Sequence, residues 1–229
     1  MSIISEERSS DSPYVATITR GRTASDGSSL RPAEIHWHMV FVKYQDNVQL
    51  LIVGPWTTSG VVSYLEGAEI LWVKFQLGTF MRHLPTRNFL DTETSLPQAS
   101  GRSFWLNSSV WQFPNYENID TFIDRLVRSG VLVRDPLVSA VLQGHPHEMT
   151  PRTVRHRFLQ ATGLTQSHIR QVERAKRAAE LLRQGASISD TVYEAGYFDQ
   201  PHLSRSLKQW IGYTPAQIVH GRGPEKLAI

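Results

Sequence analysis

The hydrophobic pattern of this 229-residue chain changes its period near residue 116. Before that point, short runs rich in β-branched and aromatic residues alternate with turn signals, as in 35–42, 48–53 and 70–77. This pattern predicts strands of a small β-rich barrel or sandwich. After that point, apolar residues recur at intervals of three and four, which predicts amphipathic helices. The sequence therefore predicts an α+β fold, with a β-rich N-terminal domain followed by an all-α domain.

The change of period divides the chain into four predicted segments. Residues 1–29 are rich in Ser, Thr, Arg and Gly and show little periodicity, so we expect a mostly disordered tail. Residues 30–134 are predicted to form a β-rich sensor or association domain, and residues 135–221 the helical domain. Residues 222–229 are predicted to be a second tail.

Charge is concentrated in one helical stretch. The chain has 24 Lys and Arg against 21 Asp and Glu, a net charge of +3 that does not by itself indicate a nucleic-acid partner. Residues 150–184, however, hold 8 Lys and Arg against only Glu173 and Glu180. A basic stretch beside a neutral, aromatic-rich half suggests two domains with different partners. A solvated helix face accounts equally well for the charge run taken alone.

The helical half contains a duplicated pattern. Short helices are predicted at 135–143 and 188–195, and each is followed by a turn and a polar-faced helix, at 151–160 and 200–211. This layout is typical of helix-turn-helix DNA readers, whose second helix enters the major groove. The long helix predicted at 165–184 between the two copies would be about 30 Å long. Since one turn of B-DNA is about 34 Å, a monomer with this spacer could contact two successive major-groove segments.

Two stretches carry a family resemblance. The stretch TPRTVRHRFLQATGLT (150–165) is similar to the first reading helix and following turn of the AraC/XylS family of bacterial transcription regulators. The stretch ISDTVYEAGYFDQPHLSRSLKQWIGYTP (188–215) is similar to that family's second helix-turn-helix. The joint order of these residues is specific, and the resemblance covers about 70 residues. It implies a sequence-specific DNA-binding transcription regulator with two helix-turn-helix units joined by a long helix.

The resemblance also implies site residues where positions match. Gly196 corresponds to the glycine of the tight turn, where a side chain would crowd the helix pair. Tyr197 and Leu207 stand where the family usually has Phe, and His156 where it often has Arg. Lys208 matches a frequent phosphate contact, and five basic residues of the long helix could collect further phosphate contacts: Arg170, Arg174, Lys176, Arg177 and Arg183. The candidate DNA-binding residues are Arg152, Thr153, Arg155 and His156 on the first helix and Gln200, Pro201, His202, Arg205 and Lys208 on the second.

Double-stranded DNA is the predicted partner, and three further partners are left open: RNA polymerase, a second copy of the chain, and a small-molecule effector in the N-terminal half. The effector-binding residues are left unassigned. No cofactor or metal is predicted, because His36 and His38 share a strand face but zinc needs three or four ligands. The stretch His145-Pro146-His147-Glu148 likewise lacks a second histidine at the spacing of a zinc-protease helix.

The sequence predicts a protein that is not an enzyme. It has no cysteine, which excludes disulfides, thiolate metal sites and a cysteine nucleophile. One alternative is an enzyme that carries such a helical domain, for example a DNA-repair alkyltransferase, but the cysteine acceptor of that chemistry is missing. The other is a scaffold whose helical half docks a protein. The sequence shows no signal peptide, and its apolar runs are too short to span a membrane, so we expect a soluble cytoplasmic protein.

Overall fold

The computed structural model describes residues 3–145 and 148–221. It is an α+β fold with a β-rich N-terminal part and a helical C-terminal part, as the sequence predicts. The chain forms two compact units. Among the described residues, unit 1 consists of 3–27, 36–55, 64–145 and 148–165, and unit 2 of 28–35, 56–63 and 166–221. This division differs from the predicted boundary at 134, because two short N-terminal segments belong to unit 2 and the first two helices after residue 134 belong to unit 1. The predicted tail at 222–229 lies outside the described residues.

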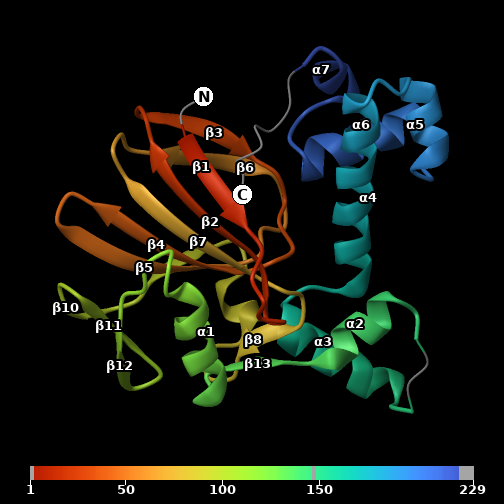
Figure 1. Cartoon of the computed structure of the whole chain (residues 1–229). Coiled ribbons are helices and arrows are strands. Elements are labelled where there is room, and N and C mark those ends of the chain that lie inside the picture. The colour runs from red at the N-terminus through yellow and green to blue at the C-terminus, as the bar shows by residue number, and fades with distance from the viewer. Residues whose placement is uncertain (1–2, 146–147, 222–229) are drawn as a thin grey trace. The chain divides into compact units, whose positions relative to one another are not determined.

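Unit 1 is built on a six-stranded antiparallel sheet with the strand order β1-β2-β7-β4-β5-β9 (Figure 1). In β7, buried and partly buried side chains alternate along the strand, as a sheet with one face on the core requires. The strands predicted at 35–42, 48–53 and 70–77 are confirmed as β4, β5 and β7. The six strands are β1 (Ile3–Arg8), β2 (Val15–Thr23), β4 (His38–Tyr44), β5 (Asn47–Val53), β7 (Glu69–Phe75) and β9 (Glu93–Ser95).

The prediction of a disordered tail at 1–29 is wrong for the residues that the structure describes. β1 pairs along its whole length with β2, from Ile3 opposite Thr23 to Arg8 opposite Ile18. The backbone pairing holds the outer strand, and Arg20 of β2 adds an exposed ion pair with Glu6 of β1 at 2.6 Å. Ile18 is fully buried, so the segment also contributes to the core.

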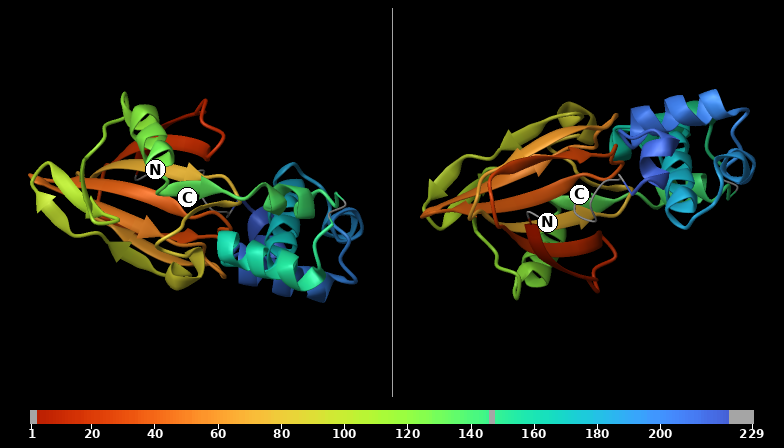
Figure 2. Two further views of the ribbon diagram at one scale, coloured as in Figure 1. Left: turned by 90° about the horizontal axis from the view of Figure 1, so that it is seen from below. Right: turned by 90° about the horizontal axis from the view of Figure 1, so that it is seen from above.

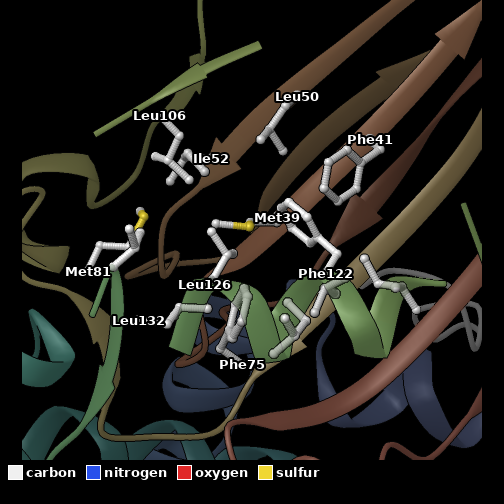
Figure 3. Packing of buried hydrophobic residues seen from close by; sticks show 14 of the residues in the cluster. Met39, Phe41, Leu50, Ile52, Phe75, Met81, Leu106, Phe122, Leu126 and Leu132 are labelled. Carbon is white, nitrogen blue, oxygen red and sulfur yellow. The ribbon is translucent and has the colours of Figure 1, made fainter. Parts of the chain in front are cut away.

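The core of unit 1 lies between the sheet and helix α1 (Ile119–Arg128). Figure 3 shows Met39 and Phe41 of β4 and Leu50 and Ile52 of β5 facing Phe122 and Leu126 of α1. Figure 2 shows α1 against the strands in two further views. Smaller strands complete the unit: β8 (Thr79–Met81) paired with β13 (Leu132–Arg134), and β10 (Gln98–Ser100), β11 (Ser103–Leu106) and β12 (Ser109–Gln112) in a separate sheet.

Two further helices of unit 1 follow the strands in sequence. They are α2 (Pro136–Leu142) and α3 (Pro151–Thr162). α3 packs against the 3-10 helix η1 (Thr86–Phe89) and β8, and the Thr86 hydroxyl donates to the Ala161 carbonyl at 3.4 Å. The position of α3 therefore depends on η1.

Unit 2 is a helical bundle with a two-stranded ribbon. α4 (Gln166–Arg183) contacts α5 (Ile188–Glu194), α6 (Gln200–Trp210) and α7 (Pro215–Val219), which gather around it in Figures 1 and 2. The ribbon pairs β3 (Gly27–Arg31) with β6 (Gly60–Tyr64). We call residues 28–35 and 56–63 the strap. No helix in 3–145 or 148–221 has both the length and the apolar content needed to cross a membrane.

Gly54 provides a test of how η1 is held. A Cβ atom at this position would lie 1.6 Å from the carbonyl oxygen of Phe89 in η1, so Gly54→Ala must push the backbone of η1 away. We expect a loss of about 1–3 kcal/mol in the free energy of unfolding, measured by urea denaturation. Gly101→Ala is the control, because an added Cβ there meets nothing within 4 Å. Equal stability of the two variants would contradict the close approach of Gly54 to the Phe89 carbonyl.

Candidate nucleic-acid interface

The first helix-turn-helix unit consists of α2 and α3, each of which begins with a side-chain cap followed by proline. The Leu137 amide donates to Asp135 Oδ1 at 3.0 Å at the start of α2. The Thr153 amide donates to Thr150 Oγ1 at 3.3 Å at the start of α3. Both caps satisfy backbone donors that a helix start leaves free, and both confirm the predicted helix starts.

α3 has a buried face and an exposed polar face. Phe158 is buried and Val154 is half-buried, which agrees with the predicted apolar pair. The four candidate DNA-binding residues of this helix are all exposed: Arg152, Thr153, Arg155 and His156. Their side chains are therefore available to a ligand.

Arg157 is half-buried and forms an ion pair within its own unit. Its guanidinium donates from Nε and Nη2 to the two carboxylate oxygens of Asp135, at 2.9 and 2.6 Å. The hydrogen bond and the charge of Asp135 raise the pKa of Arg157. Since Asp135 also caps α2, this bidentate pair joins the start of α2 to α3.

The second helix-turn-helix unit consists of α5 and α6. Asp199 caps α6 by accepting from the His202 amide at 2.7 Å, and Ser187 caps α5 by accepting from the Asp190 amide at 3.0 Å. Leu203, Leu207 and Trp210 form the buried face of α6, as predicted. Gln200, Pro201, Arg205 and Lys208 are exposed. His202 is half-buried, with its ring edge-to-face against Tyr197 at 5.1 Å.

Gly196 lies in the turn between α5 and α6, as predicted, but the predicted reason for a glycine there, crowding of the two helices, is wrong. A Cβ at Gly196 would meet nothing within 4 Å, so a side chain would not crowd the helices. The backbone there has a φ of +68°, in the left-handed region that glycine adopts without steric cost. The turn therefore requires glycine for its conformation.

The C-terminal end of α6 is bound by the strap, which sequence analysis missed. The Ala33 amide donates to the Trp210 carbonyl at 2.7 Å, and the Ser59 amide donates to the Gln209 carbonyl at 2.9 Å. The Ser59 hydroxyl donates to the Lys208 carbonyl at 3.3 Å. Lys208 Nζ in turn donates to the Gly212 carbonyl at 3.0 Å. The last carbonyls of α6 therefore have partners, and the Lys208 ammonium already has one.

The basic residues of α4 are divided between internal contacts and solvent. Arg174 lies over the Tyr197 ring at 4.7 Å, Lys176 pairs with the buried Glu34 at 3.4 Å, and Arg183 pairs with Glu180 at 3.5 Å. Arg170 and Arg177 are exposed and have no ion pair within the described part of the chain. These two are the α4 cations best placed for phosphate contacts.

The histidine motifs show no metal cluster. Nδ1 of His36 lies 2.7 Å from the Phe75 carbonyl oxygen. The motif at 145–148 lies partly outside the described residues. Within 3–145 and 148–221, no group of three or more His, Cys, Asp and Glu side chains could hold a metal ion.

Comparisons with known proteins identify the class of the helical region. Residues 147–220 match a family model described as a helix-turn-helix domain. A comparison with curated proteins found no match. The helical region is therefore a helix-turn-helix domain, and its predicted resemblance to the AraC/XylS DNA-binding domain is confirmed. A domain of this kind supports a DNA-binding transcription regulator.

Three solved structures that resemble this chain are of ToxT from Vibrio cholerae. One covers 96% of this chain and 98% of that chain, at 11% identity and a TM-score of 0.39. Another, of ToxT from strain O395, covers 96% and 97%, at 8% identity and a TM-score of 0.41. A third, of ToxT bound to (E)-4-(8-methylnaphthalen-1-yl)but-3-enoic acid, covers 96% and 99%, at 9% identity and a TM-score of 0.39. These values describe a loose likeness.

Proposed function

We propose that this chain is a transcription regulator that binds a specific duplex DNA sequence through the exposed faces of α3 and α6. The observation that carries the proposal is the division of both helices into a buried apolar face and an exposed face with base-reading residue types. In α6, Leu203 and Leu207 are fully buried while Gln200 and Arg205 are exposed. A helix anchored in this way can present its N-terminal side chains to base edges.

The exposed side chains have the donor patterns that base recognition requires. Arginine donates two hydrogen bonds to O6 and N7 of guanine, and glutamine pairs with N6 and N7 of adenine. Arg152, Arg155 and Arg205 are the candidates for guanine, and Gln200 for adenine. Phosphate contacts, with Arg170 and Arg177 as candidates, would supply much of the affinity and make it fall with salt.

The proposed site is bipartite. α4 has 18 residues and is therefore about 27 Å long, close to the roughly 34 Å of one turn of B-DNA. The test is selection of binding sites from random duplex DNA with the full chain. Two enriched half-sites about one turn apart would support the proposal, whereas one half-site would contradict a reading role for α3. Absence of any enriched sequence would contradict sequence-specific binding.

Arg205→Ala tests a single base contact. We expect this variant to bind the selected site about 1–3 kcal/mol more weakly and to lose discrimination at one base position, because a bidentate pair to guanine is lost. The measurement is a gel-shift titration at fixed salt. Arg102→Ala is the control, because it removes the same charge from an exposed position in unit 1. An unchanged affinity of Arg205→Ala would remove this residue from the interface.

The proposal also includes the two domain functions predicted from the sequence. Residues 135–221 would bind DNA, and residues 30–134 would sense or associate. A DNA-bound regulator acts through RNA polymerase, which is the second macromolecular partner we expect, and a homodimer would be detected by light scattering. The protein would act in the cytoplasm, where bacterial DNA lies. The alternative is a scaffold whose helical half docks a protein. In that case the chain does not bind duplex DNA, or charge reversal at Arg155 and Arg205 leaves its affinity for duplex DNA unchanged.

A cavity in unit 1 favours control by a small molecule. It has a volume of about 620 Å³, within the range of ligand sites. Apolar side chains that include Phe41, Leu71 and Phe113 line part of it. Its charged lining residues are Arg20, Arg22, Lys43, Glu6 and Glu69. An apolar body and one polar or acidic group are the ligand features that such a lining accommodates.

Val48→Trp tests this cavity. A panel of aromatic acids and their uncharged amides is screened for compounds that raise the melting temperature of the full chain and change its affinity for the selected DNA. The indole at position 48 should fill part of the cavity and weaken binding of any such compound at least tenfold, by roughly 1.4 kcal/mol. Val110→Trp is the control, at a half-exposed strand position outside the cavity lining. Equal compound affinity for both variants would place the effector elsewhere.

A further inference from the structure

Phe198 is the most exposed large apolar side chain among the described residues. Its exposed fraction is 91%, although it stands next to the buried Tyr197. Tyr197 points inward, where its hydroxyl hydrogen-bonds with that of Ser206 at 2.8 Å. The turn between α5 and α6 therefore directs two consecutive aromatic residues to opposite sides, one into the domain and one into solvent.

The usual structural reason for an apolar residue at this position does not apply. Phe198 immediately precedes the N-cap Asp199, and an apolar residue there often packs on the fourth residue of the helix as a hydrophobic staple. That fourth residue is Leu203, which is fully buried, while Phe198 is almost fully exposed. Since the side chain makes so little contact with its own domain, its role is better sought in a ligand.

The position of Phe198 indicates which ligand. It adjoins the first turn of α6, where Gln200 and Pro201 are exposed and where the proposed function places the base edges. In the major groove, the only apolar group on a base edge is the C5 methyl group of thymine. A phenyl ring at the groove-facing end of a reading helix matches that group in size and polarity.

We propose that Phe198 contacts a thymine methyl group and makes the second helix-turn-helix prefer thymine at one position of its half-site. This inference rests on the proposed DNA-binding function and adds a specificity-determining residue to it. The contact uses apolar packing, so it reads the methyl group and not the hydrogen-bonding edge of the base.

Tyr193 distinguishes a DNA contact from a general aromatic docking surface. It is also highly exposed, at 88%, but it lies on α5 beside Asp190 and Glu194. Those carboxylates repel phosphates, so this part of α5 is a poor DNA surface. A protein partner that docks on exposed aromatics would use Tyr193 as well as Phe198. Tyr193 therefore provides an internal control.

The experiment removes the methyl group from the DNA and the ring from the protein, separately and together. Each thymine of the selected site is replaced in turn by deoxyuridine, which lacks only the C5 methyl group. The full chain and its Phe198→Ala and Tyr193→Ala variants are titrated against these duplexes. We expect Phe198→Ala to bind the thymine site about three- to tenfold more weakly, and one deoxyuridine substitution to weaken the unaltered chain by a similar factor.

The combination of the two changes decides the question. For Phe198→Ala, that deoxyuridine substitution should have no further effect, whereas Tyr193→Ala should retain the full loss. Equal sensitivity of the Phe198→Ala variant and the unaltered chain to every deoxyuridine, or loss of affinity by Phe198→Ala for all sequences alike, would overturn the proposal. If the unaltered chain selects no DNA sequence, that result contradicts the proposed DNA-binding function itself, and the thymine contact that rests on it. Because Phe198 is exposed, its variant should keep the melting temperature of the unaltered chain.

Discussion

The second helix-turn-helix depends on the apolar face of α4. Ile169, Val172, Ala175 and Ala179 are at most 1% exposed, and α5, α6 and α7 all pack against this helix. α5 has 7 residues, α6 has 11 and α7 has 5, and isolated helices below about 12–15 residues are marginal in water. Their stability therefore comes from packing, and the direction of α6 follows from its contact with α4.

The strap adds a second constraint, which acts at the far end of α6. Three strap donors satisfy the carbonyls of residues 208–210, and each such hydrogen bond contributes about 0.5–1.5 kcal/mol. The side chain of Leu30 also packs so closely on Gly212 that a Cβ there would lie 1.9 Å from a Leu30 methyl carbon. Since the strap comes from residues 28–35 and 56–63, the helical bundle of residues 166–221 is completed by a part of the chain that precedes it by more than 100 residues.

Local signals predicted most of the elements, and non-local contacts account for the errors. The strands β4, β5 and β7 and the starts of α2, α3 and α6 follow from period and from capping residues, which act within a few positions. The polar segment 1–29 gave no such signal, because its strands are held by partners elsewhere, as when Arg8 pairs with Asp120 at 2.6 Å. The exposed candidates on α3 and α6 were predictable from helical periodicity, while the pairing of Arg157 with Asp135 depends on how two helices meet.

These constraints differ between the two ends of α6. At its C-terminal end, the carbonyls of Lys208, Gln209 and Trp210 are bound by the strap, and the Lys208 ammonium is held by the Gly212 carbonyl. At its N-terminal end, the cap from Asp199 is local, and Gln200 and Pro201 remain exposed. The strap therefore binds the backbone at the C-terminal end of α6, whereas the N-terminal end is capped only by a residue of its own turn. On the proposed function, we expect base recognition by α6 in its first half and in the turn before it, while Lys208 also binds the Gly212 carbonyl of its own domain.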